Sequence, residues 1–208
     1  MYWKNLTYLG DSMLLLPTAV LIAVFVFWKS GRWQTALGWL VTFGAAGMIV
    51  SISKIMFLGF FIGSRTYNFT GFSGHTTMSS TFWPVLMWMI SAQWPTLWRR
   101  IMILAGYLLP LAIGFSRLEL HAHSPSEVVS GAILGLSLSS IYLFIQRDTV
   151  LKAISVMQLA LFVIIPAWIM LHGQPATTQQ FLAKLSAKLA GIEKPFTRTE
   201  LLKLHSAN

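Results

Sequence analysis

Six long apolar segments, separated by short polar connectors, dominate the sequence. An α-helix needs about 20 residues, with a range from about 17, to cross the hydrocarbon core of a bilayer, and the shorter segments reach this length with their flanks. Neighbouring helices satisfy carbonyl groups freed by a proline, so Pro17, Pro84, Pro110 and Pro166 do not exclude such helices. We predict an all-α, polytopic membrane bundle with about six transmembrane helices, at 13–28, 37–57, 78–94, 101–115, 128–145 and 151–171.

The composition agrees with a lipid environment. Of the 208 residues, 55% are hydrophobic and 10% are charged, whereas a soluble domain carries about 25% charged residues. The mean hydropathy is +0.66. The net charge of +9 comes from residues scattered between the apolar segments, so no nucleic-acid surface is expected. The chain has no cysteine, which excludes disulfides, thiolate catalysis and cysteine-ligated zinc.

The connectors sort onto two sides when the predicted helices alternate in direction. One side receives short connectors that contain Lys29, Arg32, Arg99, Arg100, Arg147 and Lys152. Short basic connectors stay in the cytoplasm, so this side is expected to be cytoplasmic. Polar segments 54–75 and 117–127, with both termini, then lie at the extracytoplasmic face of a bacterial inner membrane. The first apolar segment is expected to remain as a helix, because no small-residue cleavage pattern follows it.

The sequence predicts two parts of unequal size, a membrane-embedded domain over 1–175 and a basic amphipathic tail over 176–208. Four apolar residues share one face of a predicted tail helix, with lysines elsewhere: Phe181, Leu182, Leu185 and Leu189. This pattern is typical of a helix that lies on a membrane surface. A helix packed on the bundle or on a partner shows the same pattern, so both arrangements remain open.

Two polar islands interrupt the apolar pattern on the same predicted side. One is Ser73-Gly74-His75, directly before the third segment, and the other covers 116–127, directly before the fifth. Ionisable residues at membrane depth are costly and usually functional. The two islands are therefore the candidate site.

The residues in and near these islands are suited to binding a phosphate. Lys54, Arg65 and Arg117 supply fixed positive charge. The Ser73 hydroxyl and the backbone N–H groups near Gly74 supply hydrogen bonds at the start of a helix, where the helix dipole favours anions.

Two histidines add reactive groups to this set. His75 and His123 titrate near neutral pH and can act as acid, base or nucleophile. Glu127, four residues after His123, could orient its ring, but segment 124–127 also has the pattern of a helix capping box, so Glu127 has a purely structural interpretation as well. His121 and His123 form a weak metal-binding pattern with no obvious third ligand except His75, so no metal is expected.

These residues resemble the type 2 phosphatidic acid phosphatase (PAP2) family, whose core is similar to that of vanadium haloperoxidases. The family's second motif, Pro-Ser-Gly-His, is matched by Ser73-Gly74-His75. Its third motif is Ser-Arg, five residues, His, three residues and Asp, and it is matched by Ser116, Arg117, His123 and Glu127. The resemblance covers about residues 54–131, and the joint match is more specific than either motif alone.

The resemblance implies a phosphohistidine mechanism that uses no metal or cofactor. His123 would attack phosphorus, Glu127 would orient His123, and His75 would protonate the leaving oxygen. The phosphoryl oxygens would be held by Lys54, Arg65, Ser73, Gly74, Ser116 and Arg117. Cationic side chains would then stabilise the transferring phosphoryl group.

The sequence departs from the family pattern at three places. Phe72 stands where the second motif has proline, and Glu127 stands where the third motif has aspartate. The first motif, Lys, six residues and Arg-Pro, is absent, because Lys54 is followed by Arg65 at a longer spacing and then by Thr66. The motif itself therefore does not support the assignment of Lys54 and Arg65 to the phosphate.

We expect a membrane enzyme that removes phosphate from a lipid such as phosphatidic acid, phosphatidylglycerol phosphate or a polyprenyl diphosphate. Two other functions remain open, namely transfer of the phosphate to another lipid, and binding or transport of a lipid phosphate without turnover. Haloperoxidase activity is not expected of a lipid-embedded chain, which has little reason to handle aqueous peroxide and halide. The expected partners are the lipid substrate and the bilayer, and the oligomeric state is left open.

Overall fold

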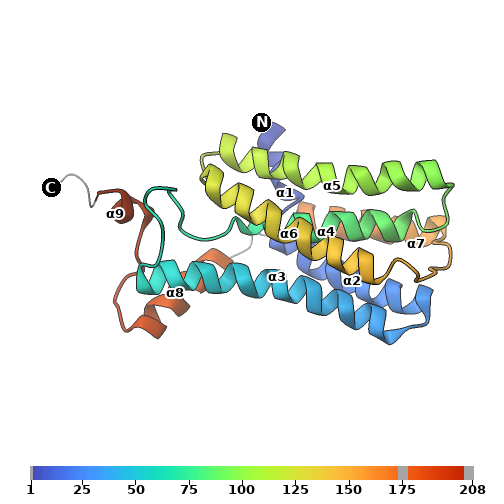
Figure 1. Cartoon of the computed structure of the whole chain (residues 1–208), viewed down its shortest axis with the longest axis horizontal. Helices are drawn as coiled ribbons and strands as arrows, with labels where there is room; N and C mark the ends of the chain where they lie inside the picture. The colour runs from blue at the N-terminus through green and yellow to red at the C-terminus, as the bar shows by residue number, and fades with distance from the viewer. Residues whose placement is uncertain (1, 173–177, 204–208) are drawn as a thin grey trace.

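The chain folds into a bundle of helices in the computed structural model, which describes residues 2–172 and 178–203 (Figure 1). In these ranges the only pairing of β type is an isolated bridge between Ser64 and Phe69. The helices are α1 (Tyr2–Tyr8), α2 (Ser12–Ser30), α3 (Trp33–Phe60), α4 (Gly74–Ile90), α5 (Thr96–Glu119), α6 (Pro125–Ile145), α7 (Val156–His172), α8 (Thr178–Ala190) and α9 (Arg198–Lys203). Each predicted membrane segment corresponds to one of the helices α2–α7, so the all-α prediction is confirmed.

Four helical stretches in the described part of the chain are long and apolar enough to cross a membrane. They are Tyr2–Ser30, which is interrupted between α1 and α2, Trp33–Phe60, Thr96–Glu119 and Pro125–Ile145. Helices α4 and α7 have 17 residues each and are shorter than these four. Large apolar side chains stay exposed along the outer helices, among them Val41 on α3 and Phe144 on α6. Such a surface is suited to lipid rather than water.

Helix α4 lies inside the bundle, where it packs against α2, α3, α5 and α6. Most of its residues are buried, and many of these are serine or threonine. Two of these hydroxyl groups bond to backbone carbonyls of the same helix, since Ser79 Oγ donates to the carbonyl of Thr76 (3.1 Å) and Thr81 Oγ1 donates to that of Thr77 (2.9 Å). Because its neighbours shield it from lipid, α4 can be short and polar and still belong to the membrane domain.

Aromatic side chains fill the space between α2, α3, α4 and α6. Trp39 is fully buried, and its Nε1 donates to the carbonyl of Ala19 on α2 (2.8 Å). Its ring lies 6.4 Å from the ring of Phe82 on α4 and 5.8 Å from that of Tyr142 on α6, measured between centroids. This packing fixes the relative positions of the helices whose ends carry the polar islands.

Helices α4 and α6 approach each other closely at two glycines. A Cβ atom added to Gly131 would lie 2.8 Å from Thr77 Oγ1, and one added to Gly135 would lie closer still to the Thr77 carbonyl. Small residues allow this kind of close helix contact in membrane proteins. The glycines therefore set the distance between the two helices that begin with the polar islands.

The basic connectors meet at the end of the bundle opposite the polar islands. The backbone N–H of Lys152 donates to the carbonyl of Lys29 (3.1 Å). Gln93, in the connector between α4 and α5, donates to the carbonyl of Leu151 (2.6 Å). The islands begin α4 and α6 at the other end, which agrees with the two-sided arrangement expected from the sequence.

The tail helix α8 packs alongside α3 (Figure 1). Leu182, Ser186 and Ala187 are buried in this contact, and a Cβ atom at Gly59 of α3 would lie 2.9 Å from the Ser186 carbonyl. Phe181 is 62% exposed. Of the two arrangements left open, the structure shows packing on the bundle, with part of the apolar face still exposed.

Candidate active site

The two polar islands meet at one end of the bundle. The backbone N–H of Ser73, which precedes α4, donates to the carbonyl of Glu127 in the first turn of α6 (3.1 Å). A cavity of about 510 Å³ opens at this junction, lined by His75, His123, Arg117 and Lys54 among others. The structure thus brings both histidines and two cations to one cavity from four different parts of the chain.

His123 lies in the turn before α6, and Glu127 holds its ring. The distance from His123 Nδ1 to Glu127 Oε2 is 2.7 Å. A carboxylate only accepts hydrogen bonds, so Nδ1 carries the hydrogen and Nε2 keeps its lone pair. Burial lowers the pKa of the His123 ring below its usual range, while the hydrogen bond and the charge of Glu127 oppose this effect. The neutral ring, with Nε2 available, is the form needed for attack on phosphorus.

The Glu127 carboxylate is fully buried and surrounded by donors. Its Oε1 accepts from the backbone N–H of Thr70 (2.7 Å) and from the Thr70 hydroxyl (2.6 Å). Its Oε2 accepts from the backbone N–H of Ser124 (3.3 Å), and the Ser124 side chain caps the Glu127 N–H in return. The capping box and the contact with His123 therefore coexist in one side chain, and neither interpretation of Glu127 displaces the other.

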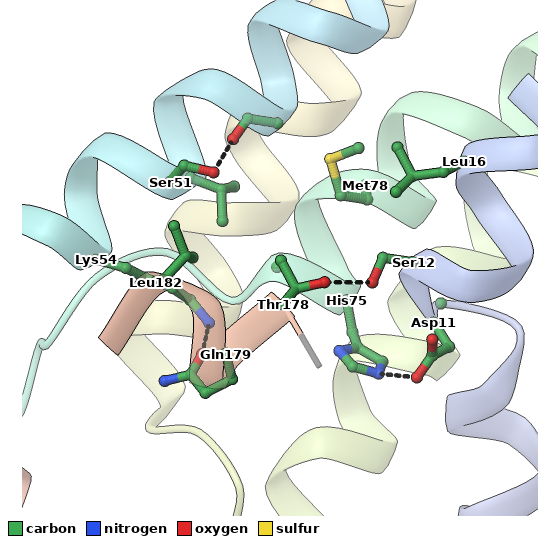
Figure 2. A pocket seen from close by; sticks show the side chains of 14 residues that line it. Asp11, Ser12, Leu16, Ser51, Lys54, His75, Met78, Thr178, Gln179 and Leu182 are labelled. Carbon is green, nitrogen blue, oxygen red and sulfur yellow. Dashed lines mark hydrogen bonds and ion pairs between the residues drawn. The ribbon is translucent and has the colours of Figure 1, made fainter. Parts of the chain in front are cut away.

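His75 stands in the first turn of α4 and faces Asp11, the N-cap of α2 (Figure 2). His75 Nε2 lies 3.6 Å from Asp11 Oδ2, and Asp11 Oδ1 accepts from the backbone N–H of Met13 (2.8 Å). Sequence reasoning missed Asp11. Its position directly before an apolar segment indicates a helix cap, but no local pattern connects it to a histidine 64 residues later in the chain.

Two cations line the cavity and still have bonding capacity. Arg117 Nη1 donates to the Thr7 hydroxyl (2.9 Å), and its buried Nε–H has no hydrogen-bond partner in the described ranges. Lys54 Nζ donates to Gln179 Oε1 on α8 (2.7 Å; Figure 2). Lysine has three donor hydrogens and arginine has five, so both can also bind an oxyanion.

The other predicted site residues lie at varying distances from the cavity of about 510 Å³, hereafter the chamber. Ser73 is fully buried and shares a hydrogen bond with Thr76 Oγ1 (2.9 Å). Gly74 lines a smaller neighbouring cavity of about 270 Å³. The Ser116 hydroxyl donates to the carbonyl of Ile113 within α5 (2.6 Å). Arg65 follows α3 in a turn and lines neither cavity, so the structure does not bring it to the other candidates.

The loop between α3 and α4 delivers Thr70 to Glu127. Gly71 has a φ of 126°, a conformation that favours glycine, and a Cβ there would lie 3.2 Å from Ser53 Oγ. The next residue, Phe72, donates its backbone N–H to the same Ser53 Oγ (3.1 Å). Proline lacks this donor, so the replacement of the motif's proline by Phe72 provides a contact that holds the loop against α3.

Arg198, at the start of α9, also reaches the site, and sequence reasoning missed it. Its Nη2 lies 2.7 Å from Glu127 Oε1 and 2.6 Å from Glu127 Oε2. The pattern Thr197-x-x-Glu200 indicates a helix start at this point, and both capping contacts are present. No pattern in the sequence relates this tail arginine to the membrane domain.

The described residues contain no group of three or more histidine, cysteine, aspartate or glutamate side chains that could hold a metal ion. His121 is exposed, with a φ of 52°, and its Nδ1 lies 3.1 Å from the carbonyl of Glu119. The site offers two imidazoles and two fixed cations around one cavity, with the buried Glu127 carboxylate bonded to His123 and the partly exposed Asp11 carboxylate beside His75.

Comparison with known proteins identifies the family of this fold. The family model described as the PAP2 superfamily matches residues 15–149. A protein of Klebsiella pneumoniae named "Uncharacterized 22.5 kDa protein in cps region" is 36% identical over 206 residues, which cover 98% of this chain and 99% of that protein. Phosphatidylglycerophosphatase B of Bacillus subtilis (strain 168) is 28% identical over 150 residues, covering 65% of this chain and 72% of that protein.

A solved structure agrees with these matches. The crystal structure of the transmembrane PAP2-type phosphatidylglycerolphosphate phosphatase from Bacillus subtilis resembles this chain with a TM-score of 0.57, at 24% sequence identity, over 71% of this chain and 76% of that one. The family match covers α2–α6, including both polar islands. This chain is therefore a multi-pass membrane protein that belongs to the PAP2 superfamily.

Proposed function

We propose that this protein is a membrane lipid phosphatase that hydrolyses a lipid phosphomonoester or diphosphate through a phosphohistidine at His123. The observation that carries the proposal is the convergence of His75, His123, Lys54 and Arg117 on one cavity, with Glu127 holding Nδ1 of His123. Membership of the PAP2 superfamily, and the similarity to phosphatidylglycerophosphatase B of Bacillus subtilis, support the general class of reaction.

The proposed first step forms a bond between His123 Nε2 and phosphorus and breaks the bond from phosphorus to the leaving oxygen. His75 gives a proton to that oxygen, so that the lipid alcohol or lipid phosphate leaves without an extra charge. Lys54 and Arg117 stabilise the phosphoryl oxygens. In the second step His75 accepts a proton from water, the water oxygen bonds to phosphorus, and inorganic phosphate leaves as His123 is regenerated.

The surroundings of the phosphate chamber support a lipid substrate. The neighbouring cavity shares Lys54, His75 and Gln179 with the chamber, and its other lining residues include the apolar side chains of Leu16, Val50, Met78 and Leu182 (Figure 2). A phosphate bound between the histidines would therefore have apolar space directly beside it. Phosphatidylglycerol phosphate, phosphatidic acid and polyprenyl diphosphates all combine a phosphate group with apolar chains.

We also propose that the site faces the extracytoplasmic side of a bacterial inner membrane. The basic connectors meet at the end of the bundle opposite the two islands. Short basic loops stay in the cytoplasm. The chamber would then open toward the periplasmic leaflet.

The test is phosphate release by the purified full chain, without added metal, from a panel of these three lipid classes. Replacing His123 by alanine should reduce release at least about a thousandfold, since residues that act as one catalytic unit cost this much when removed. The matched control is His121→Ala, because His121 is exposed and does not line the chamber. Full turnover by His123→Ala would end the proposed mechanism.

The same assay separates the other functions left open by the sequence. Labelled phosphate that moves to a lipid alcohol, rather than into water, would identify a phosphotransferase. Tight binding of a lipid phosphate with no turnover across the panel would identify a binding or transport protein.

A further inference from the structure

The tail residue Arg198 is joined to the histidine pair through Glu127. Its Nη2 is within 2.7 Å of both Glu127 carboxylate oxygens and 3.1 Å from the Thr70 hydroxyl. Glu127 in turn holds Nδ1 of His123 at 2.7 Å. Arg198 thus contacts the group that sets the orientation of the proposed nucleophile, although 71 residues separate it from Glu127 in the chain.

Several contacts on either side of Arg198 hold this part of the tail in place. Before it, the backbone N–H of Phe196 donates to the carbonyl of Leu58 at the end of α3 (2.9 Å). After it, Glu200 caps the backbone N–H of Thr197 (2.6 Å). Farther back, α8 packs on α3, and Gln179 accepts from Lys54. The guanidinium is therefore presented to Glu127 by a fixed segment.

The same segment covers the place where the family's first motif differs in this chain. The motif has arginine seven residues after its lysine, and seven residues after Lys54 this chain has Phe61. The Phe61 ring packs on the ring of Phe196 with a centroid distance of 4.7 Å. The residue found in place of the motif's arginine thus anchors the segment that delivers Arg198.

We propose that Arg198 is a positioning residue of the active site, which fixes the Glu127 carboxylate and through it the His123 ring, so that the C-terminal tail is a functional part of the enzyme. This inference rests on the proposed function for its catalytic meaning. The family match ends at residue 149, so it does not include Arg198, whereas the match to the Klebsiella protein covers 98% of the chain and extends into the tail.

The proposal has an electrostatic consequence that mere support of the fold would not have. The negative charge of Glu127 and the positive charges of Lys54 and Arg117 act on His123. Arg198 forms an ion pair with Glu127 and thereby partly neutralises its charge. Without the Arg198 guanidinium, the negative charge of Glu127 would be less neutralised. It would then stabilise the protonated form of the His123 ring more strongly. The pKa of His123 should therefore rise when Arg198 is neutralised.

The first test follows His123 itself and needs no turnover. NMR titration of the imidazole nitrogens in the purified full chain, with and without Arg198→Gln, should show a higher pKa of His123 in the variant than in the wild type. The matched control, Lys194→Gln, removes a cation from an exposed tail position four residues away and should leave the titration unchanged. A His123 titration that is the same in Arg198→Gln and in the wild type would overturn the proposal.

The second test uses phosphate release. Arg198→Gln should lower kcat on the order of 10- to 100-fold with little change in KM, because a misplaced catalytic group costs rate at this scale. In Arg198→Ala, added guanidinium ion at non-denaturing concentration should restore part of the lost rate, which a purely structural defect would not allow. Normal turnover by Arg198→Gln beside an inactive His123→Ala would contradict the role of Arg198 and leave the proposed function standing.

Discussion

Glu127 combines two tasks in one carboxylate, and the two can be separated by experiment. It completes the cap of α6 and it holds the His123 ring, using the same oxygen, Oε2, for the Ser124 N–H and for His123 Nδ1. Glutamine keeps a similar shape and an oxygen that can accept, but it removes the charge. The fold should therefore tolerate Glu127→Gln better than the chemistry does.

The pH dependence of phosphate release should reveal the contact between Glu127 and His123. In the proposed mechanism the His123 ring attacks only when neutral. Because burial lowers the pKa of this ring, the acid limb of the pH–rate profile of the wild type should lie below the usual histidine value of about 6.5. Glu127 opposes the effect of burial, so Glu127→Gln should move the limb to still lower pH. Its maximal rate should fall about 100-fold or more, because the ring loses its orienting carboxylate.

The control for that profile is Glu119→Gln, which removes an exposed carboxylate eight residues earlier. The pH of its acid limb and its maximal rate should equal those of the wild type. A Glu127→Gln enzyme whose acid limb moves to higher pH would contradict the assigned contact.

Asp11 provides the second test at this scale. Asparagine is as good an N-cap as aspartate, so Asp11→Asn should preserve the start of α2 while removing the charge beside His75. We expect kcat to fall about tenfold for a lipid monoester, whose leaving alkoxide needs a proton. For p-nitrophenyl phosphate, whose leaving group needs no proton, the loss should be small. Asp148→Asn, at an exposed position, is the matched control; equal losses on both substrates would argue against an acid role for His75.

At the scale of the elements, the approach of α4 to α6 sets the distance between the two islands. A methyl group at Gly135 would collide with the backbone of α4. Gly135→Ala should lower the free energy of unfolding by about 1–3 kcal/mol, the usual cost of overpacking, and should reduce phosphate release. Thermal unfolding in detergent measures the first effect.

The control for this prediction is Gly44→Ala. A Cβ atom at Gly44 of α3 has no neighbour within 4 Å, and alanine favours a helix interior over glycine by up to about 1 kcal/mol. This variant should be neutral or more stable. Equal stability of Gly135→Ala and the wild type would show that α4 and α6 do not pack as described.

The elements also show which features the sequence could predict. The helices follow from the lengths of the apolar segments, and the contact of His123 with Glu127 follows from a spacing of four residues at the start of one helix. Asp11 and Arg198 could not be found in this way. Their partners lie 64 and 71 residues away in the chain, and tertiary packing alone brings them together.

At the scale of the whole molecule, the tail belongs to the architecture of the site. The sequence predicts a membrane-embedded part and a separate basic tail, and the structure adds contacts from the tail to the chamber through Gln179 and Arg198. The amphipathic pattern of the tail helix is the same on a bilayer and on the bundle, so periodicity could not distinguish the two. Arg65, assigned to the phosphate by its charge and by the family resemblance, lies outside both cavities.

The orientation of the whole molecule can be tested with single cysteines, because the chain has none of its own. Tyr67, in the loop at the site end, and Thr96, at the opposite end, are both exposed. In intact bacterial cells a membrane-impermeant maleimide should label Tyr67→Cys, and it should label Thr96→Cys only after the membrane is permeabilised. The reverse pattern would place the active site in the cytoplasm.

The central claim is that His123 carries the phosphate during turnover. Wild-type protein mixed with labelled lipid phosphate and denatured within the turnover time should contain an acid-labile phosphohistidine, and peptide mapping should assign it to His123. The label should be absent from His123→Ala and present in His121→Ala. A phosphate found on His75, or turnover without any protein-bound phosphate, would contradict the account.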